Sequence, residues 1–176
     1  MAFKKSPPQT DMGRIIEQFC SRPLTQEESV TYGNALRDTM RKGAAPNQPV
    51  NIHGKDRLPV EAVVEVAVFG NLGAVNALKV LMEDQSLVLS GARQSLEGLT
   101  PLQFIAKYGS KMETTSAPIA ARLLANDPRS DVASKNGGKS AAELAGNSSV
   151  GIAITLAKVR PPATPRTSPA GAGLKT

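Results

Sequence analysis

The chain has few of the residues from which reactive sites and large aromatic cores are built. Its 176 residues include no Trp, one Cys and one His, and aromatic side chains make up only 3% of the sequence. The lone Cys20 excludes an internal disulfide, and without a second Cys or His these residue types cannot assemble a zinc site. The core must therefore be built from Ala, Val, Leu and Ile, which suits short helices that approach one another closely.

Long apolar runs are also missing. No stretch reaches the roughly 18 consecutive apolar residues that a membrane span requires, so we expect no contact with a membrane. The first eight residues, MAFKKSPP, are not followed by the apolar region of a signal peptide. We therefore expect a cytoplasmic protein, or one that acts in the cytoplasm of a host cell if it is a secreted effector exported without a signal peptide.

Basic residues are in excess only at the two ends of the chain. Residues 6–157 contain 15 basic and 15 acidic residues, so this body has no excess charge to attract phosphate groups. We do not expect the folded body to bind nucleic acid. The whole net charge of +6 comes from Lys4, Lys5, Lys158, Arg160, Arg166 and Lys175. A nucleic-acid accessory or a virion component that uses these basic ends remains an alternative.

The most informative segment of the chain is residues 98–109, which read GLTPLQFIAKYG. Thr100 can cap a helix by accepting a hydrogen bond from its first turn, and Pro101 suits the first helical position. The apolar residues that follow lie at helical spacing and form one stripe. Gly109 can end the helix in the left-handed conformation. The segment therefore predicts a turn followed by a short helix.

Parts of this pattern recur at offsets of 39 and 40 residues. Phe69 and Gly70 align with Tyr108 and Gly109, and residues 138–145 repeat the turn and the helix start. The pattern resembles the ankyrin repeat, in which a turn precedes a Thr-Pro-Leu-His-x-Ala helix. In this chain Gln103 stands where the family has His. Residues 35–47, ending in GAAPN, resemble the end of such a repeat. The family unit has about 33 residues, so we expect the excess in loops, notably in residues 110–118.

The resemblance implies an all-α, ankyrin-like solenoid of antiparallel helix pairs. We expect a flexible arm at 1–10, a repeat domain at 11–159 and a disordered, Pro- and Gly-rich basic tail at 160–176 that folding does not need. The repeat domain divides into units 11–47, 48–90, 91–131 and 132–159. Residues 63–68 alone would pass for a strand, but the repeat register assigns them to a helix. The expected helices are 11–20, 25–43, 59–69, 72–83, 99–108, 117–125, 140–145 and 149–159.

The candidates for chemistry do not assemble a catalytic site. Gly138, Lys139 and Ser140 match the end of a phosphate-binding loop, but the pattern needs Gly where Ala133 stands, so we interpret them as a turn and a helix start. His53 has no metal-binding or catalytic partner in the sequence, and Cys20 is interpreted as a small buried residue. Glu61 and Glu65 lie one helical turn apart, which is typical of a solvated face. We expect a non-enzyme without a cofactor. A small enzyme with an unrecognised site remains an alternative.

The resemblance also implies a function, which is to bind a protein partner through the concave face made by the turns and the first helices. An adaptor, an inhibitor or a secreted effector would all fit. The residues between Pro161 and Pro169 contain a Pro-x-x-Pro pattern that SH3-like domains recognise and two Ser/Thr-Pro sites for kinases, although a linker is the simpler interpretation. On the concave face the expected contact residues are Asn51, His53, Arg57, Arg93, Gln103, Lys107, Lys135 and Lys139.

Overall fold

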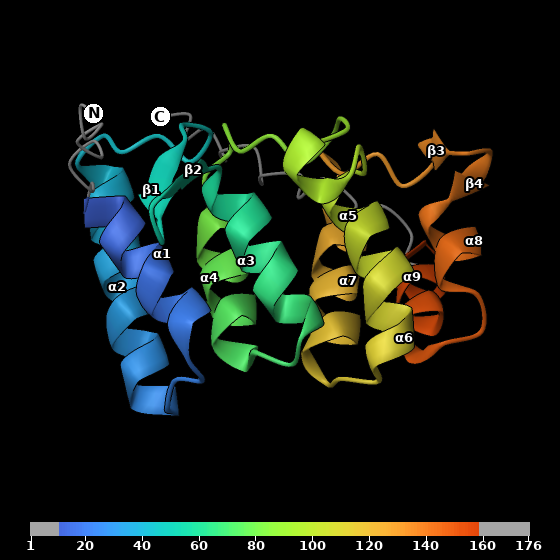
Figure 1. Cartoon of the computed structure of the whole chain (residues 1–176), viewed down its shortest axis with the longest axis horizontal. Coiled ribbons are helices and arrows are strands. Elements are labelled where there is room, and N and C mark those ends of the chain that lie inside the picture. Colours follow the sequence, from blue (N-terminus) through green and yellow to red (C-terminus); the bar gives the residue numbers. More distant parts are fainter. Residues whose placement is uncertain (1–10, 159–176) are drawn as a thin grey trace, which may run out of the picture.

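Helices that run antiparallel in pairs form most of the chain in the computed structural model, which describes residues 11–158. The first pair is α1 (Asp11–Ser21) with α2 (Gln26–Arg41), and the second is α3 (Pro59–Val68) with α4 (Leu72–Met82). The third pair consists of one continuous helical segment beside α7 (Ser116–Asn126). This segment is made of α5 (Pro101–Phe104), the π-helical turn η2 (Ile105–Gly109) and α6 (Ser110–Met112). The fourth pair is α8 (Ala141–Ala145) with α9 (Ser149–Lys158) (Figure 1).

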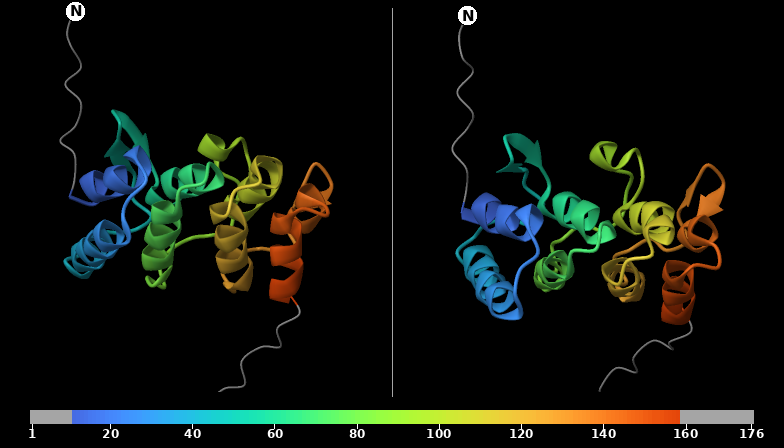
Figure 2. Two further views of the ribbon diagram at one scale, coloured as in Figure 1. Left: turned by 90° about the horizontal axis from the view of Figure 1, so that it is seen from below. Right: turned by 60° about the horizontal axis from the view of Figure 1, so that its bottom comes forward.

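The pairs lie side by side in a row, so that the helices form two layers. The first helix of each pair lies in one layer and the second helix in the other (Figures 1 and 2). Within the first layer α1 contacts α3, α3 contacts α5 and η2, and η2 contacts α8; within the second layer α2 contacts α4, α4 contacts α7, and α7 contacts α9. The core fills the space between the layers and between neighbouring pairs. None of the helices in the described residues is long and apolar enough to cross a membrane.

Three connecting segments project at the same edge of the row, and we call them fingers 1, 2 and 3 (Figure 1). Finger 1 (residues 50–57) is an antiparallel hairpin of β1 (Val50–Ile52) and β2 (Lys55–Arg57). Finger 2 (residues 91–99) contains the short helical turn η1 (Gln94–Leu96), and an isolated bridge joins Arg93 to Leu99. Finger 3 (residues 135–140) is the hairpin of β3 (Lys135–Asn136) and β4 (Lys139–Ser140).

The expectation of an all-α chain is therefore wrong in one respect, because two small antiparallel sheets accompany the helices. Their turns explain them. His53 and Gly54 have φ values of 51° and 77°, and Gly137 and Gly138 have 56° and 80°. Two consecutive residues with positive φ match the right-handed twist of the flanking strands, so these two-residue turns bring the strands into register.

The Val-rich segment is helical, as the repeat register predicts. In α3 the side chains of Val60, Val63, Val64 and Val68 are all buried, because the helix packs against α1, α4, α5 and α7. A helix that is covered on most sides can be apolar around most of its circumference. Burial between neighbouring helices therefore overrides the local preference of Val for strands.

The start of the second helix confirms the capping interpretation of its sequence. The hydroxyl of Thr25 accepts a hydrogen bond from the backbone N–H of Glu28, and the Glu28 carboxylate accepts one from the backbone N–H of Thr25. The same reciprocal arrangement joins Thr100 to Gln103 at α5 and Ser140 to Glu143 at α8. Asp11 lies in the first turn of α1.

The third pair departs from the expected repeat at Gly109. This residue has φ −64°, so it does not end the helix, which continues through Met112 and closes at Glu113 with φ 48°. The excess residues of this unit therefore lengthen the helix, and residues 110–118 are not a loop. Gly109 is required for packing instead, because a Cβ built there would lie 2.8 Å from the Cβ of Ala117 on α7. Gly70, its partner in the alignment, does take the positive φ, at 98°.

Polar side chains of one pair donate hydrogen bonds to backbone carbonyl oxygens near the end of a helix in the pair before it. Asn71 Nδ2 donates to the carbonyl oxygen of Phe19 at the end of α1, at 2.8 Å. The hydroxyls of Thr114 and Ser116 donate to the carbonyl oxygens of Val68 and Ala67 at the end of α3. These bonds fix the second pair against the first and the third pair against the second.

The apolar positions are mostly as expected, with two exceptions. Leu36, Leu78, Leu81 and Leu124 are fully buried, and Met40 and Leu123 are half-buried. Val30 and Ile119, which share the helical spacing of these apolar residues and would be expected to pack with them, are exposed. Val30 lines an open groove with Leu72 of α4, and Ile119 lines one with Ile152 of α9. Helical spacing alone does not distinguish such a groove between neighbouring helices from the core.

We expect the ion pair between Arg129 and Asp127, which joins the third helix pair to the second, to make the free energy of unfolding depend on pH. Arg129 donates to both oxygens of Asp127 and also to the carbonyl oxygens of Met82 and Asp84 at the end of α4. The Arg129 guanidinium lowers the pKa of Asp127 below its ordinary value. A lowered pKa in the folded state adds stability above the ordinary pKa of about 3.9, and this stability is lost as the pH falls through the folded-state value.

The free energy of unfolding of Asp127→Asn should therefore fall less between neutral and acidic pH than that of the unsubstituted chain. Denaturant titrations at a series of pH values measure this slope. The slope should shrink without vanishing, because Arg37 and Ser86 likewise lower the pKa values of Glu83 and Asp84. Identical slopes for the two proteins would contradict the assignment.

Candidate partner-binding surface

Finger 1 carries three of the expected contact residues, and the structure gives them different roles. His53 is exposed at the turn, and its Nδ1 lies 3.0 Å from Oε1 of Glu17 on α1. The backbone N–H of His53 donates to the same oxygen at 3.1 Å. Asn51 is half-buried, and its side-chain oxygen accepts a hydrogen bond from the N–H of Gly54. Arg57 is mostly buried and forms an ion pair with Glu65 of α3, so it holds the finger to the helix.

The carboxylate of Glu97 joins finger 2 to the first-helix layer, in addition to the buried side chains of Leu96 and Leu99. Glu97, at φ 57°, accepts hydrogen bonds from Lys107 Nζ, at 2.9 Å, and from the hydroxyl of Tyr108. These contacts lower the pKa of Glu97 and raise the pKa of Lys107. Arg93 is half-buried and donates to the carbonyl oxygen of Val88 at 2.8 Å. Lys107 and Arg93 are therefore engaged within the chain, and neither was distinguishable from a free cation in the sequence.

Finger 3 presents two exposed cations. Lys135 and Lys139 lie on either side of the Gly137–Gly138 turn, and both side chains are exposed. Ser140 ends the hairpin and caps α8, which confirms the interpretation of residues 138–140 as a turn and a helix start. Asn136 Nδ2 donates to the carbonyl oxygen of Gly98 at 3.2 Å, so finger 3 is also joined to finger 2.

Gln103 was expected to be an exposed contact residue, and this is wrong. Its side chain is only 2% exposed. Its Oε1 accepts a hydrogen bond from the backbone N–H of Thr100, and its Nε2 donates to the carbonyl oxygen of Ser134 at 3.0 Å. The side chain thus joins α5 to the segment before finger 3. The spacing of Thr100 and Gln103 is that of a capping box, and this signal could have shown that the Gln side chain is used within the chain.

The charges on the finger side are not balanced in the way that the count of 15 against 15 suggests. Glu17, Glu65 and Glu97 each face a basic side chain of the same chain. Among the described residues, no ion pair is formed by Lys55, Lys135 or Lys139. These three carboxylates are thus engaged within the chain, whereas Asp56 of finger 1 is exposed and accepts a hydrogen bond only from the side chain of Asn51 among the described contacts. The exposed lysines of fingers 1 and 3 remain available to a partner.

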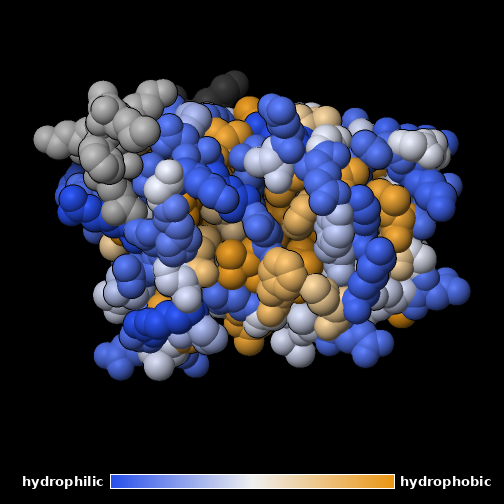
Figure 3. Space-filling model, in the orientation of Figure 1, coloured by the Kyte–Doolittle hydropathy of each residue, from blue (hydrophilic) through white to orange (hydrophobic). Residues whose placement is uncertain are grey.

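An apolar patch lies on the first-helix layer at the ends of α3 and α6 that point away from the fingers (Figure 1). Phe69 at the end of α3 is 62% exposed, and Met112 at the end of α6 is 45% exposed. Their segments adjoin, because the hydroxyl of Thr114 donates to the carbonyl oxygen of Val68. Figure 3 shows apolar side chains gathered over the middle of this face, with hydrophilic residues around them. This patch was not predicted from the sequence, although Phe69 directly precedes the helix-ending Gly70.

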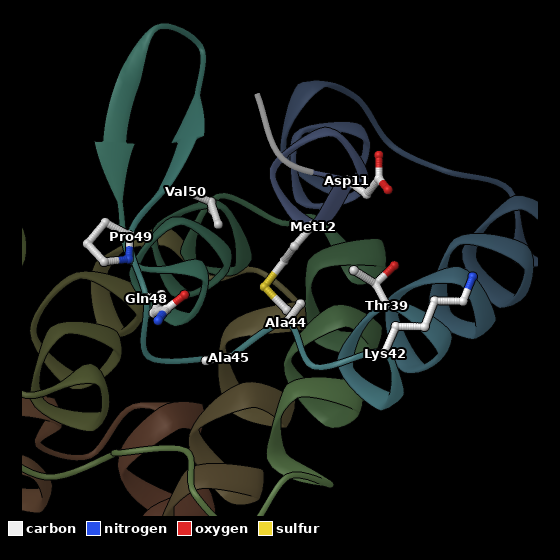
Figure 4. A pocket seen from close by; sticks show the side chains of 9 residues that line it. All are labelled: Asp11, Met12, Thr39, Lys42, Ala44, Ala45, Gln48, Pro49 and Val50. Atoms are coloured by element: carbon white, nitrogen blue, oxygen red, sulfur yellow. The ribbon is translucent and has the colours of Figure 1, made fainter. Parts of the chain in front are cut away.

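A cavity of about 320 Å³ opens beside finger 1 at the start of the row. The side chain of Met12 on α1 points into it toward Ala44, and Val50 of β1 lies across from it (Figure 4). Asp11 and Lys42 lie at its rim, with Thr39 beside them. The lining offers an apolar socket with two opposite charges at its edge, which suits an apolar side chain better than a reacting group.

The residues with reactive side chains have structural roles. Cys20 is largely buried, and this burial raises its pKa to about 12. The carboxylate of Glu61 is not on a solvated face as expected, because it is buried and accepts a hydrogen bond from the backbone N–H of Leu58 at the start of α3. Glu65 pairs with Arg57 instead of forming a carboxylate pair with Glu61. Over residues 11–158, no group of three His, Cys, Asp or Glu side chains is placed to hold a metal ion.

Comparison with known proteins adds no relative. No family model, curated protein or solved structure matches this chain. The function must therefore be inferred from the described surface. The Pro-x-x-Pro pattern, the arm and the basic residues at 4–5 and 160–175 lie outside the described residues.

Proposed function

We propose that the chain is a non-catalytic, ankyrin-like module that binds a protein partner through its fingers and first-helix layer. The observation that carries this proposal is that three fingers project from one edge and each is tied down. Glu17 holds finger 1, Glu97 joins finger 2 to η2, and Asn136 joins finger 3 to finger 2. A surface that is ordered before binding loses little conformational entropy when a partner docks.

The recurring motif and the row of helix pairs support the ankyrin-like assignment. In repeat proteins of this kind each pair packs on its neighbours, and the stack presents an extended surface for recognition. A cytoplasmic adaptor, an inhibitor or a secreted effector would use such a surface in the same way. The choice between these roles depends on the partner, which the fold does not specify.

The surface favours a partner that combines acidic and apolar side chains. Lys55, Lys135 and Lys139 would face carboxylates, and Phe69 and Met112 would pack against an apolar group. An interface with an apolar centre and a charged rim is the common arrangement in protein complexes. The nucleic-acid alternative depends on the chain ends and predicts a steep fall of affinity with salt, whereas mixed-charge protein contacts predict a weak one.

The test is capture of partners from a lysate by the full chain, followed by mass spectrometry and quantification with variants. We expect the double variant Lys135→Glu/Lys139→Glu to capture at least about tenfold less partner than the unsubstituted chain, because reversed charges repel an acidic surface. A tenfold loss of affinity corresponds to about 1.4 kcal/mol of binding free energy. Lys79→Glu/Arg122→Glu is the charge-matched control on α4 and α7, and its capture should be unchanged.

Equal capture by the finger 3 variant and the unsubstituted chain, or equal loss with the control, would contradict the proposal. Arg57 and Lys107 are unsuitable for charge reversal, although both were expected contact residues. Each already pairs with a carboxylate of the chain, so reversal would place like charges side by side and disturb the fold.

A further inference from the structure

Finger 3 carries an asparagine whose amide is open to attack from its own backbone. Of the asparagines in the sequence, Asn136 alone is followed by a glycine, Gly137. An asparagine side chain loses ammonia when the backbone nitrogen of the next residue attacks its amide carbon. Glycine has no side chain to obstruct this attack, so the pair of Asn136 and Gly137 is the least hindered one in the chain.

The attacking nitrogen is free in the structure. Gly137 is the first turn residue between the paired residues Asn136 and Lys139, and among residues 11–158 its backbone N–H has no hydrogen-bond partner. An N–H without an acceptor loses its proton more easily than one held by a carbonyl oxygen. Asn136 is exposed to water, and its hairpin has only two residue pairs. Because so short a ladder opens easily, the amide can reach the nitrogen.

At other asparagines the corresponding nitrogen is held. The backbone N–H groups of Gln48, Asp127 and Ser148, each of which follows an asparagine, donate to carbonyl oxygens three residues earlier. Asn34 and Asn76 lie inside α2 and α4, where the next N–H belongs to the hydrogen bonding of the helix. Finger 3 thus combines the least hindered neighbour with an unbonded nitrogen.

We propose that Asn136 is a site of spontaneous deamidation and that its conversion releases finger 3 from finger 2. The nitrogen of Gly137 gives up its proton and bonds to Cγ of Asn136. The bond from Cγ to Nδ2 breaks, and Nδ2 takes up a proton and leaves as ammonia. Water then opens the resulting succinimide ring at either carbonyl. One opening gives aspartate, and the other gives isoaspartate, in which the side-chain carbon has entered the backbone.

Conversion removes the contact that joins the two fingers. Nδ2 of Asn136 donates to the carbonyl oxygen of Gly98 at 3.2 Å, and an ionised carboxylate has no hydrogen to donate in its place. Isoaspartate also lengthens the backbone of β3 by one carbon, which disturbs the register of the hairpin. Finger 3 then moves independently of finger 2. This inference does not depend on what the fingers bind.

Incubation of the full chain at neutral pH, followed by proteolytic digestion and mass spectrometry of the peptides, tests the site. We expect Asn136 to convert at least about tenfold faster than the exposed Asn34 and Asn147, a difference of about 1.4 kcal/mol in activation free energy. Isoaspartate should exceed aspartate. Asn136→Gln is the matched control, because it keeps an amide whose cyclisation needs a larger ring, and it should stay unconverted at this position.

Hydrogen–deuterium exchange before and after incubation tests the release. Residues 91–99 and 135–140 should exchange faster in the converted chain, whereas incubated Asn136→Gln should match its fresh sample. Equal rates at Asn136, Asn34 and Asn147, conversion at Asn136 only in urea, or aspartate as the sole product would overturn the proposed site. Unchanged exchange of both fingers in the converted chain would overturn the release of finger 3.

Discussion

Leu124→Ala is expected to lower the free energy of unfolding by about 2–5 kcal/mol, the usual cost of truncating a buried leucine. Leu124 is fully buried on α7. This helix contacts α3, α4, η2 and α9, so a cavity at its centre weakens the packing of three neighbouring pairs. Urea unfolding followed by circular dichroism measures the loss.

Leu72→Ala provides the control, because Leu72 is exposed at the start of α4. It should change the stability by less than about 0.5 kcal/mol, as is usual for surface sites. A loss below that value for Leu124→Ala would contradict the described packing. Leu123, which the sequence also places on the packed face of α7, is only half-buried, so we expect its truncation to cost less.

Substitutions of Asn71 should reveal how strongly neighbouring pairs are tied. Its side-chain oxygen caps α4 at the N–H of Ala74, while its Nδ2 donates to the carbonyl oxygens of Phe19 and Arg22. Asn71→Ala should cost about 1–3 kcal/mol, because buried backbone groups lose their partners. The measurement is again the free energy of unfolding in urea.

The variant Asn71→Asp distinguishes the capping of α4 from the hydrogen bonds that Asn71 donates to the first helix pair. At an ordinary helix start Asp caps as well as Asn. Here the carboxylate would face two carbonyl oxygens without a donor, so at neutral pH we expect Asp to be at least as destabilising as Ala. If Asn71→Asp is as stable as the unsubstituted chain, the bonds to Phe19 and Arg22 do not hold the first two pairs together.

Much of the helical arrangement could be predicted from local signals. Thr25 and Glu28 mark the start of α2 by their spacing, and the stripe of Leu78 and Leu81 identifies the packed face of α4. The helical state of the Val-rich α3 followed from the repeat register and not from propensity. The capping and spacing signals lie within a few neighbouring residues, whereas the repeat register depends on a pattern that recurs after 39 to 40 residues.

Features that depend on contacts between distant segments were not predicted. The close approach of Gly109 to Ala117 and the π-helical turn at 105–109 arise where two helices of the third pair meet. The pairing of β1 with β2 depends on the positive φ of His53, which cannot be recognised from the sequence.

The same limit applies to the candidate surface. Arg57, Lys107 and Lys135 are equivalent as basic residues near predicted turns. The structure separates them, because Glu65 and Glu97 neutralise the first two and Lys135 forms no ion pair among the described residues. Partner binding at the fingers therefore stays a prediction, with Lys135 and Lys139 as its best-placed residues.

Hydrogen–deuterium exchange of the chain with and without its captured partner is the most direct test of the finger surface. We expect slower exchange in residues 50–57, 91–99 and 135–140 and in the first helices beside them, because a docked partner shields these backbone groups. Exchange in α2 and α4 should be unchanged. Slower exchange confined to the second helices, with the three fingers unaffected, would contradict the account.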